Sequence, residues 1–152
     1  MSWAAAEFKA IDLGDKRLDK RAVLLAEQLA AKPGSSIPQA CGGWAETQAA
    51  YRFFDNAEVS WEGIMAAHWR ASAERMRAQR VVLCLQDTTE LDFNGQKAAG
   101  LGPLSYEAQR GMYLHPTYAV TPEREPLGVL DAWMWARTLK DAKGVRAPDV
   151  CE

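Results

Sequence analysis

The chain has 152 residues, of which 48% are hydrophobic and 25% are charged. This length can bury a hydrophobic core and predicts one domain or a pair of small ones, and the composition excludes a disordered chain. The formal net charge of −2 and the isoelectric point near 5.7 give no bulk electrostatic argument for nucleic acid, because dedicated DNA-binding domains are usually basic.

The cysteines and the N-terminus indicate the cellular compartment. The three cysteines are far apart and form no Cys-x-x-Cys pair, so we expect neither a disulfide framework nor a zinc site: Cys41, Cys84 and Cys151. The N-terminal segment contains Glu7 and lacks a continuous apolar stretch, and no later run approaches the roughly 18 apolar residues of a membrane span. We therefore expect a cytoplasmic protein without a targeting segment or membrane contact.

A helix is predicted over residues 12–31. Asp15 is a suitable N-cap, and the sequence Lys32-Pro33-Gly34 ends the helix. Apolar residues recur at helical spacing along it, at Leu18, Ala22, Leu25 and Leu29.

Three cations share one side of this helix, because Arg17, Lys20 and Arg21 stand at positions i, i+3 and i+4. One interpretation is a patch that contacts phosphates. The alternative is a solvated helix face on which Asp15 and Asp19 are the partners of the cations.

Further helices follow, so residues 1–80 are predicted to form a bundle of three or four helices. Ser36 and Pro38 begin a short helix that ends at Gly42-Gly43, Trp44–Phe54 form the next, and Ser60 caps one from Trp61 to about Gln79. Aromatic residues at this density are usually packed, so we expect three of them in the core: Tyr51, Phe53 and Phe54. His68 is expected to be packed or hydrogen-bonded.

The second half is predicted to be an antiparallel meander of three strands. Val81–Leu85 is a short apolar run typical of a core strand, and Met112–Val120 and Leu127–Arg137 follow. Pro116 indicates an edge strand or a bulge in the second of these. Only a polar tail, Thr138–Glu152, comes after the third strand, so either the first half covers the sheet or the chain stops before the elements that would pack on it.

Carboxylates are the candidates for chemistry in this half. Asp87 lies where α/β sheets usually place functional residues, at the end of the first strand, although a capping or turn role is the alternative. Other acids follow at Glu90, Asp92 and Asp131, and His115 is the imidazole nearest to them in the sequence. Clustered carboxylates bind Mg²⁺ or Mn²⁺, and a pair of such ions supports phosphoryl transfer, but Asp87 supplies only one ligand.

Six segments resemble transposases of the Tn5-like (IS4) family in order and approximate spacing. They are Leu13-Gly-Asp-Lys-Arg17, Ala49-Ala-Tyr-Arg-Phe53, Gln86-Asp-Thr-Thr89, Gly100-Leu-Gly102, Gly111 with His115, and Leu127-Gly-Val with Trp133-Met-Trp-Ala-Arg137. The resemblance covers essentially the whole chain.

The resemblance implies an α+β chain with two parts. Residues 1–79 would be the helical domain that binds transposon-end DNA, and residues 80–152 would begin a catalytic domain of RNase H-like fold. The family uses an Asp-Asp-Glu triad with two Mg²⁺ or Mn²⁺ ions. Asp87 matches the first acid and metal ligand, whereas the other two have no counterpart here, so we expect a truncated transposase.

The resemblance also implies contacts with double-stranded DNA at the transposon inverted repeat. The matching cations are Arg17, Arg21 and Arg52, and we add Lys20 from the cationic patch. Ser35 stands where a relative can carry lysine, which implies one missing phosphate contact. Family members dimerise on DNA, and a monomer remains the alternative for this chain, which would associate with the bacterial nucleoid.

Three functions remain open. The first is a fragment that binds DNA without cutting it and holds no metal tightly. The second is a competent nuclease in which Asp87, Asp92 and Asp131 form an improvised metal site. The third is an interaction protein or inactive remnant with no DNA role, which would associate through an exposed sheet edge and its tryptophans.

Overall fold

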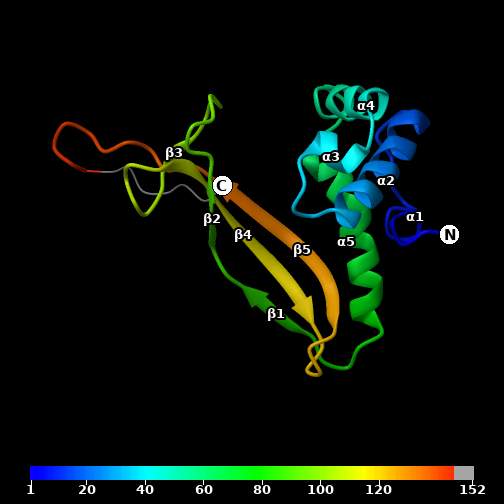
Figure 1. The fold of residues 1–152 in the computed structure, drawn as a ribbon. Helices are drawn as coiled ribbons and strands as arrows, with labels where there is room; N and C mark the ends of the chain where they lie inside the picture. The colour runs from blue at the N-terminus through cyan, green and yellow to red at the C-terminus, as the bar shows by residue number, and fades with distance from the viewer. Residues whose placement is uncertain (146–152) are drawn as a thin grey trace. The chain divides into compact units, whose positions relative to one another are not determined.

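A computed structural model describes residues 1–145 of the chain (Figure 1). The end of the predicted polar tail, with Cys151 and Glu152, lies outside the described residues. The chain divides into two compact units, Met1–Ala78 and Gln79–Glu152, and each is described by itself. Helices are followed by an antiparallel sheet, which confirms the predicted α+β class. No helix among the described residues is long and apolar enough to cross a membrane.

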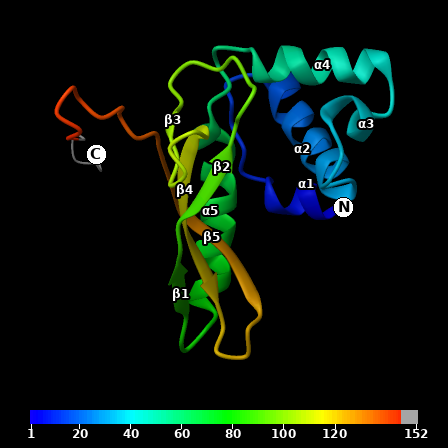
Figure 2. The same ribbon diagram turned by 60° about the vertical axis from the view of Figure 1, so that its left-hand side comes forward.

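The first unit contains five helices (Figures 1 and 2). They are α1 (Trp3–Glu7), α2 (Lys16–Ala31), α3 (Ile37–Cys41), α4 (Trp44–Phe54) and α5 (Trp61–Arg77). Figure 2 shows α2, α3 and α4 as neighbours. The short helix α1 was missed in the sequence, because five residues are too few to show a helical period.

Most predicted helix ends hold because local capping determines them. The predicted start of the first long helix at residue 12 was wrong, because α2 begins at Lys16, directly after its N-cap. The carboxylate of Asp15 accepts a hydrogen bond from the backbone N–H of Arg17 and so caps α2, as predicted. Gly42 ends α3 with a φ of 72°, a left-handed conformation that glycine adopts without strain. The hydroxyl of Ser60 accepts a hydrogen bond from the N–H of Gly63 at the start of α5.

The core of the helical unit draws on most of its helices and on the segment before α2. Its buried residues are Ile11, Leu13, Ala22, Leu25, Cys41, Ala50, Phe53 and Ala67. Only one of the three aromatic residues predicted to pack is buried. Phe53 is 3% exposed, whereas Tyr51 and Phe54 are 49% and 47% exposed, so the prediction was wrong for these two. The buried residues of α4 are Thr47, Ala50 and Phe53, which share one helix face, and Tyr51 and Phe54 lie off that face.

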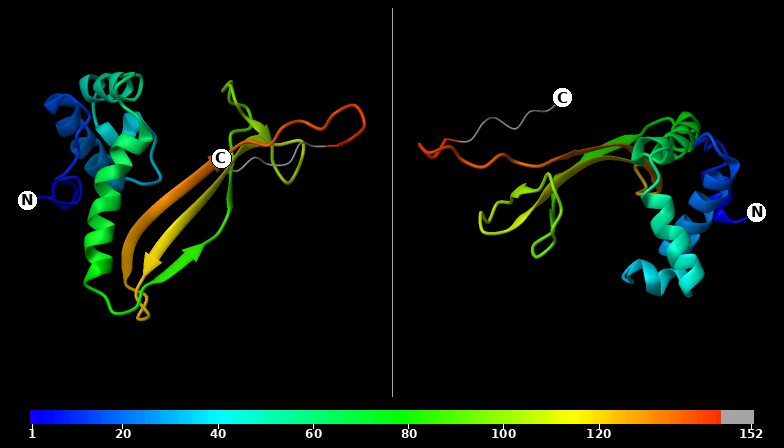
Figure 3. Two further views of the ribbon diagram at one scale, coloured as in Figure 1. Left: turned by 180° about the vertical axis from the view of Figure 1, so that it is seen from behind. Right: turned by 90° about the horizontal axis from the view of Figure 1, so that it is seen from above.

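The second unit is a sheet organised around one long strand (Figure 3, left). Its strands are β1 (Leu83–Gln86), β2 (Thr89–Asp92), β3 (Gly102–Pro103), β4 (Arg110–Val120) and β5 (Pro126–Trp135). All four of the others pair antiparallel with β4. The three predicted strands correspond to β1, β4 and β5. The strand β2, which follows β1 after a break, and the strand β3 were not among them.

The split occurs at Asp87 and Thr88, opposite a proline. Gln86 pairs with Thr117 and Thr89 pairs with Leu114, so Pro116 lies opposite the interruption. Proline has no backbone N–H to donate to a neighbouring strand, which accounts for the break. The bulge expected near Pro116 is present as a register shift after Thr117 toward β5, whereas the edge position was wrong because β4 is central.

The apolar run Val81–Leu85 was predicted to be a buried core strand, and this was wrong. The strand begins at Leu83, and the exposed fractions of Leu83 and Leu85 are 44% and 51%. The described part of the second unit contains strands and loops but no helix, so it has no layer of its own to cover β1.

Candidate nucleic-acid interface

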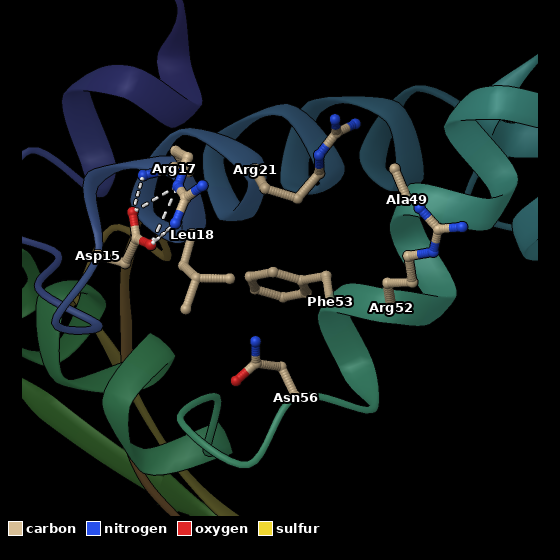
Figure 4. A pocket seen from close by; sticks show the side chains of 8 residues that line it. All are labelled: Asp15, Arg17, Leu18, Arg21, Ala49, Arg52, Phe53 and Asn56. Atoms are coloured by element: carbon tan, nitrogen blue, oxygen red, sulfur yellow. Dashed lines mark hydrogen bonds and ion pairs between the residues drawn. The ribbon is translucent and has the colours of Figure 1, made fainter.

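A groove lies between α2 and α4 in the helical unit (Figure 4). It has a volume of about 350 Å³. Its lining residues are Asp15, Arg17, Leu18, Arg21, Ala49, Arg52, Phe53 and Asn56. In Figure 4 the side chains of Leu18 and Phe53 point toward one another from the two helices, which gives the groove an apolar base below its charged rim.

Three of the four predicted DNA-binding cations line this groove. Arg17 and Arg21 come from the first two turns of α2, and Arg52 comes from the last turn of α4. The fourth, Lys20, is exposed on α2 but does not line the groove. Helical spacing placed Lys20 beside the arginines, whereas the position of α4 decides which side of α2 forms the groove.

Arg17 is highly exposed, with 91% of its side chain accessible. Its guanidinium is held by the carboxylate of Asp15, with Nη2 2.7 Å from Oδ2 and Nε within 3.2 Å of both oxygens. These hydrogen bonds from Arg17 lower the pKa of Asp15 to about 2. Asp15 therefore stays negatively charged beside the groove at all physiological pH values.

Arg21 forms an ion pair between helices. Its Nη1 donates to Oε2 of Glu46 in the first turn of α4, and the two side chains are 28% and 43% exposed. Glu46 was not singled out in the sequence, because an acid in the first helical turn is common and its pairing with α2 depends on tertiary structure. Asp19 does not pair with the groove arginines, since it accepts hydrogen bonds from the N–H of Leu13 and from Lys16.

Arg52 is exposed and has no ion pair among residues 1–145. Its neighbour Phe53 is buried in the core, so the backbone of α4 directs Arg52 away from the core. The groove therefore contains one free arginine and two that are paired with carboxylates of the same unit.

The positive charge of the groove is local. Residues 1–78 contain ten lysine and arginine residues and ten aspartate and glutamate residues, so the unit has a formal net charge of zero. The near-neutral composition that gave no argument for DNA therefore coexists with a cluster of arginines at one site.

A family model for transposase DNA-binding matches residues 1–59. This segment is similar to the DNA-binding domain of transposases. All residues that line the groove, from Asp15 to Asn56, belong to the matched segment of the domain. The groove is therefore part of the segment that is similar to transposase DNA-binding domains.

The acids of the second unit that the structure describes do not form a common site. Asp87 is exposed at the break between β1 and β2, where its Oδ1 accepts from the N–H of Thr88 at 2.8 Å. Asp92 accepts from Asn94 and Gln109, and Asp131 accepts from the N–H of its neighbour Ala132: each carboxylate is engaged locally.

Glu90 holds a loop. Its Oε1 accepts from the N–H of Ser105 at 2.9 Å. Hydrogen bonds from the side chain of Ser105 and from this N–H lower the pKa of Glu90. His115 Nδ1 lies 2.6 Å from the hydroxyl of Thr88, next to Asp87 in the sequence. Within residues 1–145 no group of three or more His, Cys, Asp or Glu side chains is arranged to hold a metal ion. The improvised metal site of Asp87, Asp92 and Asp131 is thus not assembled.

Proposed function

We propose that this protein binds double-stranded DNA at a transposon inverted repeat through the groove between α2 and α4. The observation that carries the proposal is that Arg17, Arg21 and Arg52 line one groove inside the segment that matches the transposase DNA-binding family. Guanidinium groups are suited to phosphate because their N–H donors can bind two of its oxygens at once.

The two helices supply complementary parts of this interface. Arg17 and Arg21 are one helical turn apart on α2, and Arg52 faces the groove from α4. We infer that these arginines contact the phosphate backbone and set the orientation of the duplex, since phosphate contacts position a protein without reading sequence. Lys20, which lies outside the groove, is proposed as a peripheral contact only.

We also propose that the parent family is the Tn5-like (IS4) family and that the sheet begins an RNase H-like domain. In that family Asp87 would correspond to the first acid of the triad and would bind Mg²⁺ or Mn²⁺. The donor set of residues 1–145 does not fit a two-metal site, because no second and third acid lie with Asp87. We therefore assign DNA binding and no cleavage step to these residues. Dimerisation on DNA and association with a bacterial nucleoid belong to the same proposal.

Fluorescence anisotropy tests DNA binding directly. The probes are a labelled duplex of the inverted repeat that flanks the gene and a mixed-sequence duplex of equal length, titrated between roughly 50 and 200 mM salt. With the inverted-repeat duplex, each of the substitutions Arg17→Ala, Arg21→Ala and Arg52→Ala should weaken binding and reduce the slope of log K against log salt by about one.

Arg77→Ala is the matched control, because Arg77 is an exposed arginine on α5 that does not line the groove. It should leave the affinity close to that of the unmodified chain. Absence of binding by the unmodified chain at low salt would overturn the proposal. Mg²⁺-dependent cleavage that Asp87→Asn abolishes would contradict binding without cutting.

A further inference from the structure

Two of the three arginines in the groove already have anionic partners. Arg17 is paired with Asp15 and Arg21 with Glu46, whereas Arg52 has no ion pair in the described part of the chain. The two acids differ in position, because Asp15 is the N-cap of the same helix as Arg17, whereas Glu46 reaches Arg21 from another helix.

A DNA phosphate and the Glu46 carboxylate would compete for the same group. The carboxylate of Glu46 accepts a hydrogen bond from Nη1 of Arg21. The same nitrogen is one of those with which a guanidinium binds phosphate in a bidentate manner. Binding of both anions at one guanidinium would bring two negative charges within a few ångströms of each other, where they repel. The phosphate must therefore displace the carboxylate.

We propose that Glu46 and Asp15 limit the affinity of the groove for DNA by occupying Arg21 and Arg17, so that only duplexes making additional contacts displace them. This inference rests on the proposed DNA binding by the groove. The two carboxylates would mainly suppress binding to mixed-sequence DNA, which depends on phosphate contacts alone. A unit with zero net charge, in which two groove arginines are paired with carboxylates, is suited to discriminate between the inverted repeat and mixed-sequence DNA.

The decisive experiment combines Glu46→Gln, Arg21→Ala and the double variant in anisotropy titrations with the mixed-sequence duplex. Glutamine keeps the size of the side chain and removes its charge. Glu46→Gln should tighten binding by roughly fivefold to tenfold near 0.1 M salt and steepen the salt slope by about one, as expected for one additional phosphate contact. In the Arg21→Ala background the same substitution should lose most of this effect.

Asp55→Asn serves as the charge-matched control. Asp55 is an exposed acid directly after α4 and has no ion pair among the described residues. Its neutralisation changes the net charge by the same amount without releasing an arginine, so it should tighten binding much less than Glu46→Gln. Circular dichroism melts confirm that every variant is folded.

The substitution Asp15→Asn provides a second, independent test of the inference. Asparagine caps a helix as well as aspartate does, so α2 keeps its cap while Arg17 is released. The variant should also tighten binding to the mixed-sequence duplex, and this gain should be lost in the Arg17→Ala background.

The outcomes separate this inference from the proposed function. If the unmodified chain binds and Glu46→Gln weakens binding, leaves it unchanged or tightens it equally without Arg21, the inference is overturned and DNA binding stands. If no variant binds at low salt, both fail.

Discussion

Glu7 of α1 accepts two hydrogen bonds from the guanidinium of Arg75 on α5, at 2.8 and 2.9 Å. Oε1 of Glu7 also lies 2.6 Å from Nδ1 of His68, which belongs to α5 like Arg75, so His68 is hydrogen-bonded as predicted. The side chain of Glu7 is 17% exposed. A helix of five residues is too short to be stable alone, so these contacts help to hold α1 in place.

Removal of the Glu7 carboxylate should therefore destabilise the helical unit. We expect Glu7→Gln to lower the free energy of unfolding by about 2 kcal/mol, the typical range for hydrogen bonds to a charged group. Urea denaturation followed by circular dichroism measures it. Glu58→Gln, at an exposed position without an ion pair in the described chain, should change stability by less than about 0.5 kcal/mol. Equal effects of the two substitutions would refute the structural role of Glu7.

The same contact predicts a pH dependence. The hydrogen bonds from Arg75 lower the pKa of Glu7 below its ordinary value of 4.5. Because the pKa is lower in the folded state, this contribution to stability is fully present above pH 4.5 and is lost as the pH falls through the folded-state pKa. Thermal melts at decreasing pH should show a loss of stability below pH 4.5 that is smaller in the Arg75→Ala variant.

The pairing of Asp15 with Arg17 can be tested by titration of one carboxylate. Carbon-detected NMR should give a pKa of about 2 for Asp15. In Arg17→Ala the value should rise toward 3.8 but stop short of it, because the backbone N–H at position 17 still donates to the carboxylate. An unchanged pKa in that variant would show that Arg17 is not the partner of Asp15.

Two adjacent phenylalanines provide a matched test of the helical core. Phe53→Ala should cost about 3–5 kcal/mol, because the side chain is buried and its removal leaves a cavity. Phe54→Ala should cost less than about 1 kcal/mol, because the side chain is about half exposed. Chemical denaturation distinguishes the two, and a larger loss at Phe54 would place the wrong face of α4 in the core.

Local sequence signals predicted most helix ends and the opposite orientations of two neighbouring side chains on α4. Capping by Asp15 and Ser60 and the glycine after α3 depend on residues within a few positions, so they are readable without tertiary structure. The order Arg52–Phe53 places neighbouring side chains on different faces of α4, so a buried Phe53 implies an outward Arg52.

The exposure of the first strand and of the side chains of Tyr51 and Phe54 could not be predicted from composition. Leu83 and Leu85 are apolar, as residues of core strands usually are, but both are exposed. Burial of a strand requires a second layer that packs on it, and the hydrophobicity of the strand does not show whether such a layer is present. The interruption at Asp87 likewise depends on Pro116, which lies on another strand and comes opposite only after β1 and β2 pair with β4.

The sequence by itself determined four of the helices, three of the antiparallel strands and the arginines that are candidates for DNA contact, because caps, periodicity and short motifs are local. Only the tertiary structure decided that Arg17, Arg21 and Arg52 line one groove, that Lys20 does not, and which acids occupy two of the arginines. The physical reason is that the position of α4 against α2 determines which charges meet, since contacts between helices depend on how their faces pack.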